Sequence, residues 1–431
     1  MIDKQTLDQT RAHSIDQAGA QPTARSLRMF RALSHPNYRR FWISAFISNV
    51  GTWMQAVAQG WLVLQLTNSP FWLGLDGFMA TVPGFFLTLA GGVFADLVDR
   101  RRLLIYTQVV AGLSALILAI LVHTGTVNVW WVLALSFVTG CCMALASPSY
   151  QAITIDLVGR EDLANAVALN SSQFQLSRLV GPLLAGLGFK FFDLAGCFYA
   201  NSVSFLAVII GFSKLQIERE KSYAHSVKDR KALWQDLLAG FTYVRRRPRV
   251  FSLLSLSAVT SLFGTPYLTF IPVFARDIVH LGETGLALMM GAAGAGAFFG
   301  ALTLAYLGDF KHKGWSVLGG AIAFGVWLIA FAQSTSVTFS LISLFGVGFA
   351  VVTSVAVTNT LLQKLVTDEM RGRVMSMFIV SFIGTMPIGN LIGGALSQRF
   401  GAPATLTGAG LVIIVFVTGM AIGNKRLRNL H

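Results

Sequence analysis

The sequence predicts an all-α membrane protein whose twelve transmembrane helices form two six-helix bundles. Hydrophobic residues make up 54% of the 431 residues and charged residues only 12%, and the mean hydropathy is +0.64. A typical soluble domain carries about 25% charged residues, so this composition excludes a soluble fold as well as a disordered chain. Apolar runs of about 20 residues, the length that crosses a bilayer, recur along the chain.

The apolar runs define the spans, and all but one of the connections between them are short. The exception is the polar stretch 214–249, which leaves six spans on each side. Within it, residues 232–244 have the pattern of an amphipathic helix that lies at the membrane surface, and residues 26–40 look similar. The predicted spans are 41–65, 71–95, 103–122, 129–153, 163–188, 194–213, 250–274, 284–307, 315–333, 337–360, 373–397 and 402–423.

We therefore expect five segments. They are a cytoplasmic N-terminal tail with an interfacial helix (1–40), a first bundle (41–213), a cytoplasmic linker (214–249), a second bundle (250–423) and a cytoplasmic tail (424–431).

The two predicted bundles repeat each other weakly. Residues 181–186 (GPLLAG) match residues 389–394 (GNLIGG), and residues 157–161 (LVGRE) match 365–369 (LVTDE) at the same offset. A parallel repeat of this kind is typical of transporters whose two halves are related by a pseudo-two-fold axis, with the substrate site at the repeat interface near the midplane.

The net charge of +14 is a topology signal. Among the 33 Lys and Arg residues, only Lys190, Arg276 and Arg399 fall in loops on one side, and Arg178 lies inside a span. The others lie on the side that carries both termini. The positive-inside rule then places both termini in the cytoplasm, and we expect a multi-pass protein of a bacterial-type inner membrane.

The sequence predicts no enzyme site, metal site or cofactor. Its three cysteines and seven histidines lack metal-ligand spacing, and no phosphate-binding P-loop is present. The expected partners are the lipid bilayer, a small-molecule substrate and a coupling ion such as the proton. We expect no nucleic acid, and we expect a monomer.

A charged loop follows the second predicted span. Residues 92–102 read GVFADLVDRRR, which resembles the signature loop of the major facilitator superfamily (G-x-x-x-D-x-x-G-R-R). Asp99 stands where glycine is usual. The twelve-span layout extends the resemblance over essentially the whole chain. The matching positions are Gly92, Asp96, Arg100 and Arg101.

Shorter stretches resemble one exporter branch of that superfamily, the transmembrane secretion effectors that include siderophore (enterobactin) exporters. The resemblance implies export by alternating access. The stretches are 35–41 (HPNYRRF), 51–55 (GTWMQ), 60–63 (GWLV), 245–248 (RRRP) and 370–374 (MRGRV).

The superfamily resemblance implies that the loop at 92–101 is a cytoplasmic gate. Asp96 and Arg100 would engage residues 369–373 when the protein faces outward, and Asp309 lies in the equivalent loop of the second half. The alternative is that the arginines of this loop only anchor it on the cytoplasmic side.

The first span carries a polar stripe. Its spacing puts five polar residues on one helix face, and lipid would leave the amide side chains poorly satisfied. They either line a substrate cavity or hold the first span against the fifth or seventh through interhelical hydrogen bonds. The stripe consists of Ser44, Ser48, Thr52, Gln55 and Gln59.

Arg178 lies well inside the fifth span, on one face with Ser171 and Gln175. An arginine within the bilayer is costly against lipid and by default marks a functional site. It would suit an anionic or catechol-like substrate or an ion pair across the cavity. Alternatively, it pairs with backbone carbonyls and packs the two halves together.

Asp76 is the best candidate for a coupling group, because a proton antiporter usually needs a titratable side chain inside the membrane. It lies in the outer third of the second span, so the alternative is that it faces outer water.

We therefore expect a secondary active exporter of a small organic molecule. The branch resemblance and Arg178 put siderophore-like substrates first and drug-like ones second. The alternatives are multidrug efflux of hydrophobic compounds, a lysophospholipid flippase, and a membrane sensor that does not transport.

Overall fold

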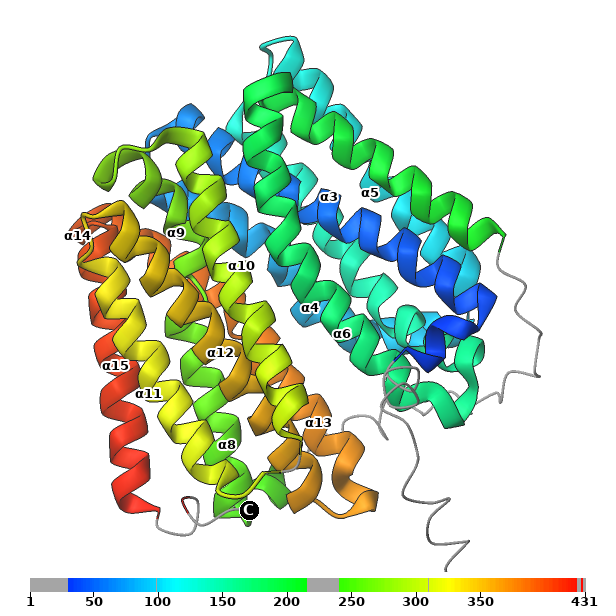
Figure 1. The fold of residues 1–431 in the computed structure, drawn as a ribbon, viewed down its shortest axis with the longest axis vertical. Helices are drawn as coiled ribbons and strands as arrows, with labels where there is room; N and C mark the ends of the chain where they lie inside the picture. The colour runs from blue at the N-terminus through cyan, green and yellow to red at the C-terminus, as the bar shows by residue number, and fades with distance from the viewer. Residues whose placement is uncertain (1–29, 98, 215–239, 309, 425–427, 429–431) are drawn as a thin grey trace, which may run out of the picture.

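The computed structural model describes residues 30–97, 99–214, 240–308, 310–424 and 428, and over 88–97 only the backbone (Figure 1). All regular structure in these ranges is helical. Eight of the described helices are long and apolar enough to cross a membrane, as the high hydropathy predicts.

The N-terminal part begins with a short 3-10 helix and continues with four α-helices. The first α-helix starts at Pro36, earlier than the expected 41, because proline suits the first helical position. Residues 36–40 therefore extend the first span and do not form a separate interfacial helix, while residues 26–29 lie outside the described ranges. The elements are η1 (Arg31–Ser34), α3 (Pro36–Thr67), α4 (Pro70–Leu97), α5 (Arg100–His123) and α6 (Val129–Ser213).

The 85-residue helix α6 is interrupted at two positions. Gly159 (φ 71°, ψ 179°) and Asp193 (φ 58°, ψ −175°) combine a positive φ with a ψ near 180°, a region that glycine reaches at little cost and that strains the backbone of any other residue. Both interruptions fall in or beside loops that the sequence predicts, after 153 and after 188. They divide α6 into three helical segments, one for each predicted span.

The C-terminal part contains the remaining helices. The predicted seventh span consists of α8 and α9 with a π-helical turn after each, and α13 and α14 together make up the predicted eleventh. Of the expected helix 232–244, residues 240–244 are described and helical, and the rest lies outside the described ranges. The elements are α8 (Pro248–Val259), η2 (Thr260–Gly264), α9 (Tyr267–Val273), η3 (Phe274–Ile278), α10 (Gly282–Leu307), α11 (Lys313–Ala332), α12 (Val337–Leu365), α13 (Asp368–Ile383), α14 (Met386–Phe400) and α15 (Ala402–Gly423).

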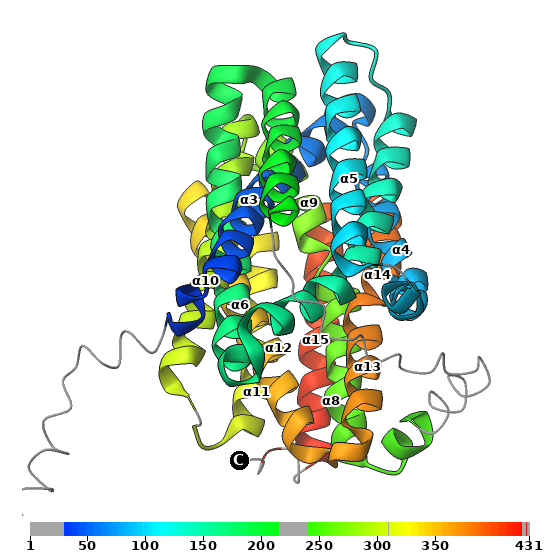
Figure 2. The same ribbon diagram turned by 90° about the vertical axis from the view of Figure 1, so that its right-hand side faces the viewer.

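The helices α3–α6 lie side by side on one side of the molecule and α8–α15 on the other (Figures 1 and 2). We call these the N-half and the C-half. They meet mainly where α6 packs on α10 and α4 packs on α14. Glycine permits both approaches: Gly294 lies against the backbone of Arg178, and Gly74 lies against Asn390 and Gly394. Small residues let membrane helices approach closely enough for backbone contact.

Three polar contacts between the halves lie at one end, which we call the sealed end. Arg276 of the C-half donates to the carbonyl of Leu64 at 3.1 Å and to Oδ1 of Asn68 at 2.7 Å. Ser69 donates to Oε1 of Gln398 at 2.6 Å. The opposite end carries the turns that precede α5 and α13.

The close approach of α6 and α10 predicts that Gly294→Ala destabilises the protein. A Cβ at this position would overlap the backbone of Arg178 and Leu179, which cannot rotate away. Overpacking of this kind costs about 1–3 kcal/mol. We expect a lower melting temperature in detergent. Gly319→Ala is the control, because its Cβ would meet nothing within 4 Å; equal effects of the two substitutions would contradict the prediction.

Candidate functional site

The carboxylate of Asp76 is enclosed by hydrogen-bond donors from two other helices. Gln59 Nε2, on α3, donates to its two oxygens at 3.0 and 2.8 Å. Ser136 Oγ, on α6, donates to Oδ1 at 2.5 Å. Both oxygens are therefore bonded to protein groups, a different arrangement from a carboxylate that simply faces outer water.

The same network continues along α3 toward the last segment of α6. Gln55 Nε2 donates to Oε1 of Gln59 at 3.4 Å, and Asn201 Nδ2 donates to Oε1 of Gln55 at 2.6 Å. Ser204 Oγ in turn donates to Oδ1 of Asn201 at 3.0 Å. We call this series of hydrogen-bonded side chains, which runs from Asp76 to Ser204, the N-half polar network.

The N-half polar network includes two residues of the polar stripe on α3, Gln55 and Gln59. Gln55 and Gln59 make interhelical hydrogen bonds, one of the two expectations, but their partners are Asp76, Ser136 and Asn201 of the N-half. The expected partners on the fifth or seventh span are not the ones found. Thr52, one turn away on α3, is half-buried.

Arg178 lies where α6 meets the C-half. Its Nη2 donates to the hydroxyl of Tyr267 on α9 at 2.9 Å, and its guanidinium carbon lies 5.5 Å from the centre of the Trp53 ring. Such a cation–π contact is favourable, more so when water is excluded. Arg178 thus joins the halves, as one alternative expected, but through a tyrosine hydroxyl and not through backbone carbonyls.

Two buried polar atoms beside this contact have no hydrogen-bond partner in the described part of the chain. They are Nε of Arg178, a donor, and Oε1 of Gln175, an acceptor. Each buried polar atom without a partner destabilises the protein by about 1–3 kcal/mol. A ligand that supplies an acceptor for Arg178 and a donor for Gln175 would remove this penalty on binding. Ser171 lies one helical turn before Gln175. Its side chain is exposed, and its hydroxyl donates to the backbone carbonyl of Val167 in the same helix.

The residues of the gate loop contact their own half. Asp99 caps α5 by accepting from the backbone of Arg102 at 3.0 Å, which is the usual role of aspartate at a helix N-terminus and accounts for the departure from glycine. Arg100 bonds Asp156 at 3.4 Å, and Arg101 bonds the backbone carbonyls of Phe212 and Ser213.

The expected contact of the gate loop with residues 369–373 is not formed among the described side chains. Arg371 pairs with Asp368 at 2.5 Å, and Arg373 contacts the sulfur of Met370 at 3.4 Å, both within α13. Gly92 and Asp96 belong to the last ten residues of α4 (88–97), over which only the backbone is described, and Asp309 lies outside the described residues.

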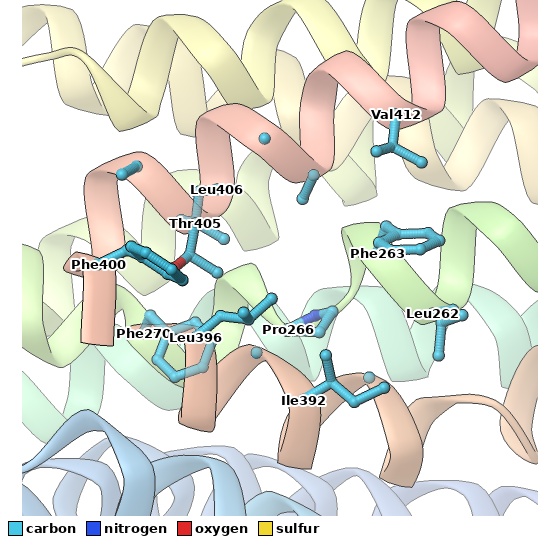
Figure 3. Close-up of a pocket in the computed structure, with 15 residues that line it drawn as sticks. Leu262, Phe263, Pro266, Phe270, Ile392, Leu396, Phe400, Thr405, Leu406 and Val412 are labelled. Carbon is cyan, nitrogen blue, oxygen red and sulfur yellow. The ribbon is translucent and has the colours of Figure 1, made fainter. Parts of the chain in front are cut away.

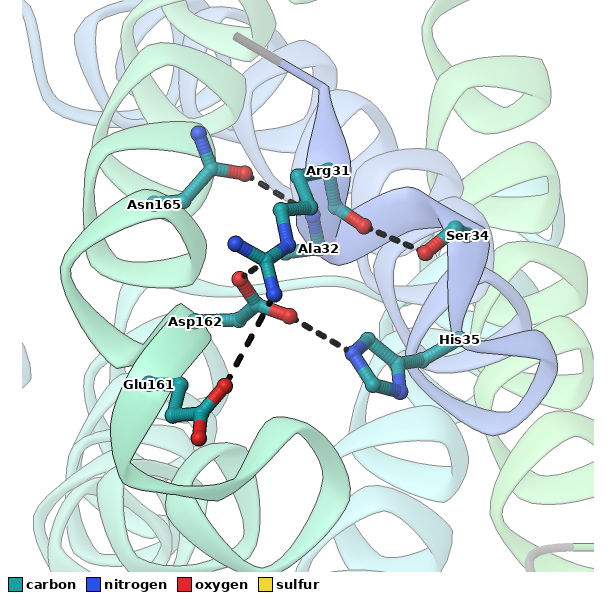
Figure 4. Close-up of polar contacts among 7 residues, drawn as sticks. All are labelled: Arg31, Ala32, Ser34, His35, Glu161, Asp162 and Asn165. Atoms are coloured by element: carbon teal, nitrogen blue, oxygen red, sulfur yellow. Dashed lines mark hydrogen bonds and ion pairs between the residues drawn. The ribbon is translucent and has the colours of Figure 1, made fainter. Parts of the chain in front are cut away.

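A polar cluster that the sequence analysis did not predict ties the N-terminal segment to α6 (Figure 4). The buried carboxylate of Asp162 accepts from Arg31 at 3.1 Å and from His35 at 2.9 Å. The backbone of Ala32 donates to Asn165 at 2.9 Å. The available signal was the acidic pair at 161–162, opposite the basic segment 26–40.

An apolar pocket of about 400 Å³ lies between η2, α9, α14 and α15 (Figure 3). Phe263, Phe270 and Phe400 form part of its wall, and Thr405 is its one side chain with a polar atom. Acyl chains of the bilayer suit this lining, whereas an anionic substrate would find no charged partner there.

The cluster at Asp162 predicts that Asp162→Ala releases the N-terminal segment. Arg31 and His35 are partly solvent-exposed, so the pairs contribute about 1 kcal/mol. We expect tryptic cleavage near Arg31 to become about fivefold faster, because cleavage follows the population of the open form. Glu161→Ala is the control: Glu161 is exposed and 3.7 Å from Arg31. A similar increase for both variants would count against the cluster.

Known proteins resemble this chain over most of its length. The staphyloferrin A transporter of Staphylococcus aureus is 23% identical, over 90% of this chain and 96% of its own. The multidrug efflux pump Tap of Mycolicibacterium fortuitum is 24% identical, over 90% and 95%. The enterobactin exporter EntS of Salmonella choleraesuis is 24% identical, over 91% and 94%.

Solved transporters share the fold. A bacterial homologue of the human lysosomal transporter Spinster, in an inward-facing and unoccupied conformation, superposes with a TM-score of 0.68 at 14% identity, over 91% of this chain and 97% of that one. The nucleoside transporter NupG superposes with a TM-score of 0.69 at 12% identity, over 90% and 99%. Residues 28–431 match the transmembrane secretion effector family. The chain therefore belongs to this family, a branch of the major facilitator superfamily of membrane transporters.

Proposed function

We propose that the protein is a secondary active exporter that moves a small organic molecule across the inner membrane by alternating access. The observation that carries the proposal is Arg178 at the junction of the two halves: its Nε and the nearby Oε1 of Gln175 have no hydrogen-bond partner among the described residues. The relatives named above, two siderophore transporters and a drug pump, support small-molecule export.

We further propose twelve spans in two six-helix bundles, 41–213 and 250–423, with the linker 214–249 and both tails in the cytoplasm. The three segments of α6 and the pairing of α8 with α9 and of α13 with α14 support this count. The positive-inside bias supports the orientation. On this topology the sealed end would face outward, as in an inward-facing state of a transporter.

The proposed substrate is anionic, with siderophore-like molecules first. Arg178 would supply a donor fork to an anionic oxygen, Gln175 would accept from a neighbouring hydroxyl, and Trp53 would cover an apolar or aromatic part. Tyr267 occupies Nη2 of Arg178, so substrate and tyrosine would compete for the same guanidinium.

The proposed coupling group is Asp76, with the proton as coupling ion. Three hydrogen bonds from Gln59 and Ser136 suit the ionised carboxylate. Protonation turns one acceptor oxygen into a donor, so at least one of these bonds must rearrange. Because the donors belong to α3 and α6, proton binding at Asp76 would change how α4 packs in the N-half.

The proposed gate consists of Gly92, Asp96, Arg100 and Arg101, with Asp309 in the equivalent loop and Asp99 as the cap that holds the turn. It would close on α13 when the sealed end opens. We propose that one chain suffices, because each part named here lies within it.

Multidrug efflux is the second candidate, favoured by the similarity to Tap and by exposed aromatic side chains such as Phe174, which is 43% exposed one turn from Arg178. A drug exporter would depend on these side chains and little on the guanidinium. A lysophospholipid flippase remains the third, and would use the apolar pocket of Figure 3.

Replacement of Arg178 distinguishes the first two candidates. In cells that lack their native exporters, we expect Arg178→Ala to lower export of a catecholate siderophore at least tenfold while changing export of a neutral dye little. Tyr267→Phe is the matched control, because it removes the hydroxyl that contacts Arg178 and keeps the ring. The assignment of Arg178 as a substrate contact is wrong if Arg178→Ala leaves siderophore export unchanged, or if both variants lose all transport equally.

Replacement of Asp76 tests the coupling. We expect Asp76→Asn, in proteoliposomes with an imposed pH gradient, to lose uphill transport while keeping downhill exchange, since the amide cannot take up a proton. Asp193→Asn is the control: it replaces an exposed carboxylate outside the N-half polar network by an amide of the same size, and it should transport normally. Full proton-driven accumulation by Asp76→Asn would exclude Asp76 as the coupling group.

A further inference from the structure

A second pocket, of about 380 Å³, lies where the helix that precedes α8 meets α8 and α13. We call it the linker pocket; Figure 2 shows these three elements together at one end of the C-half. Its inner wall is apolar, with Val244 and Leu254 buried, and its mouth carries Phe241 and Phe251, which are 57% and 54% exposed. The remaining lining residues are Arg245, Ser255, Ala258, Met377 and Ser381.

The mouth of the linker pocket is strongly basic. Arg245 is part of its lining, and Arg246, Arg247 and Arg249 follow within four residues; all four are exposed. In the described part of the chain, Arg245, Arg246 and Arg249 have no carboxylate within ion-pair distance, while Arg247 lies over the ring of Tyr243 at 5.2 Å. Four exposed arginines with no acidic partner among the described residues produce a local positive field that attracts an anion.

We propose that the linker pocket binds an anionic phospholipid, with its phosphate on Arg245 and part of one acyl chain between α8 and α13. Basic pockets between transmembrane helices on the cytoplasmic side suit anionic headgroups, because basic residues near the surface attract the negative charge of the headgroup. The wall from Leu254 to Ala258 spans one helical turn, about 6 Å, enough to cover several methylene groups.

The pocket combines an apolar wall with a basic mouth, and this combination favours a lipid over other anions. A free phosphate would use the arginines but leave Phe241 and Phe251 exposed. A hydrophobic drug would use the apolar wall but not the charge. Only an amphiphile satisfies both, and the pocket opens at the end that the proposed topology assigns to the cytoplasmic leaflet, on which this proposal rests.

The bound lipid would connect the linker to the gate. Gly240 lies against Met377 and Arg373 of α13, so the linker helix, α8 and α13 share the pocket. The first turns of α13 carry residues 369–373, on which the proposed gate closes. Lipid occupancy would therefore hold α13 against α8 and favour the state seen here.

Native mass spectrometry of the full-length protein tests the proposal. With equimolar phosphatidylglycerol and phosphatidylcholine, we expect wild type to retain phosphatidylglycerol about fivefold more. Arg245→Gln should remove this preference, and Ala258→Leu should lower binding of both lipids by filling the wall. Arg160→Gln is the matched control, an exposed arginine at the same end of the N-half with no ion pair among the described residues; it should behave as wild type.

Three results would overturn the proposal: equal retention of the two lipids by wild type, an equal loss of preference in Arg160→Gln, or displacement of phosphatidylglycerol by millimolar inorganic phosphate. Because the readout is binding, a failure of transport leaves it unaffected. The topology is checked separately with Arg246→Cys, which should react with an impermeant maleimide in inside-out vesicles and not in intact cells.

Discussion

Close backbone contact between the two halves is the constraint on which the rest of the structure depends. Lipid tails are as apolar as the helix surfaces, so membrane helices associate through packing and interhelical hydrogen bonds and not through a hydrophobic driving force. Gly294 on α10 and Gly74 on α4 provide that packing, since each meets backbone atoms of the opposite half. Arg178 lies at one of these crossings, and its position relative to Tyr267 follows from it.

The two charged side chains inside the spans near the junction, Asp76 and Arg178, differ in how fully they are hydrogen-bonded. Asp76 is fully enclosed by Gln59 and Ser136 of its own half, so its bonds survive any rigid movement of the halves. Arg178 bonds Tyr267 of the other half and keeps an unpartnered Nε. A group whose partners move with it suits proton storage, whereas a group at the moving junction suits substrate recognition.

The sequence predicted the helical membrane fold and drew attention to Asp76 and Arg178, because charge is rare in apolar spans. It could not predict their partners. Helix periodicity identifies the face that Gln59 occupies but not its partner Ser136, which lies 77 residues away in the sequence. Arg178 and Tyr267 likewise lie 89 residues apart. Asp99 is different, because aspartate is a common residue at helix N-termini. The sequence alone could therefore have explained why aspartate stands in place of glycine there.

The two ends of the molecule differ in how their charged contacts are built, and this bears on alternation. A transporter that alternates needs its two states within a few kcal/mol of each other. Arg100 and Asp156 are both more than a third exposed and 3.4 Å apart, so their pair contributes at most about 1 kcal/mol and is easily exchanged for a contact on α13. Arg276 instead bonds the carbonyl of Leu64 in the last turn of α3, where the helix dipole favours a cation, and the side chain of Asn68. On the proposed function, opening the sealed end would therefore cost more than releasing Arg100, and substrate binding at Arg178 would offset the difference.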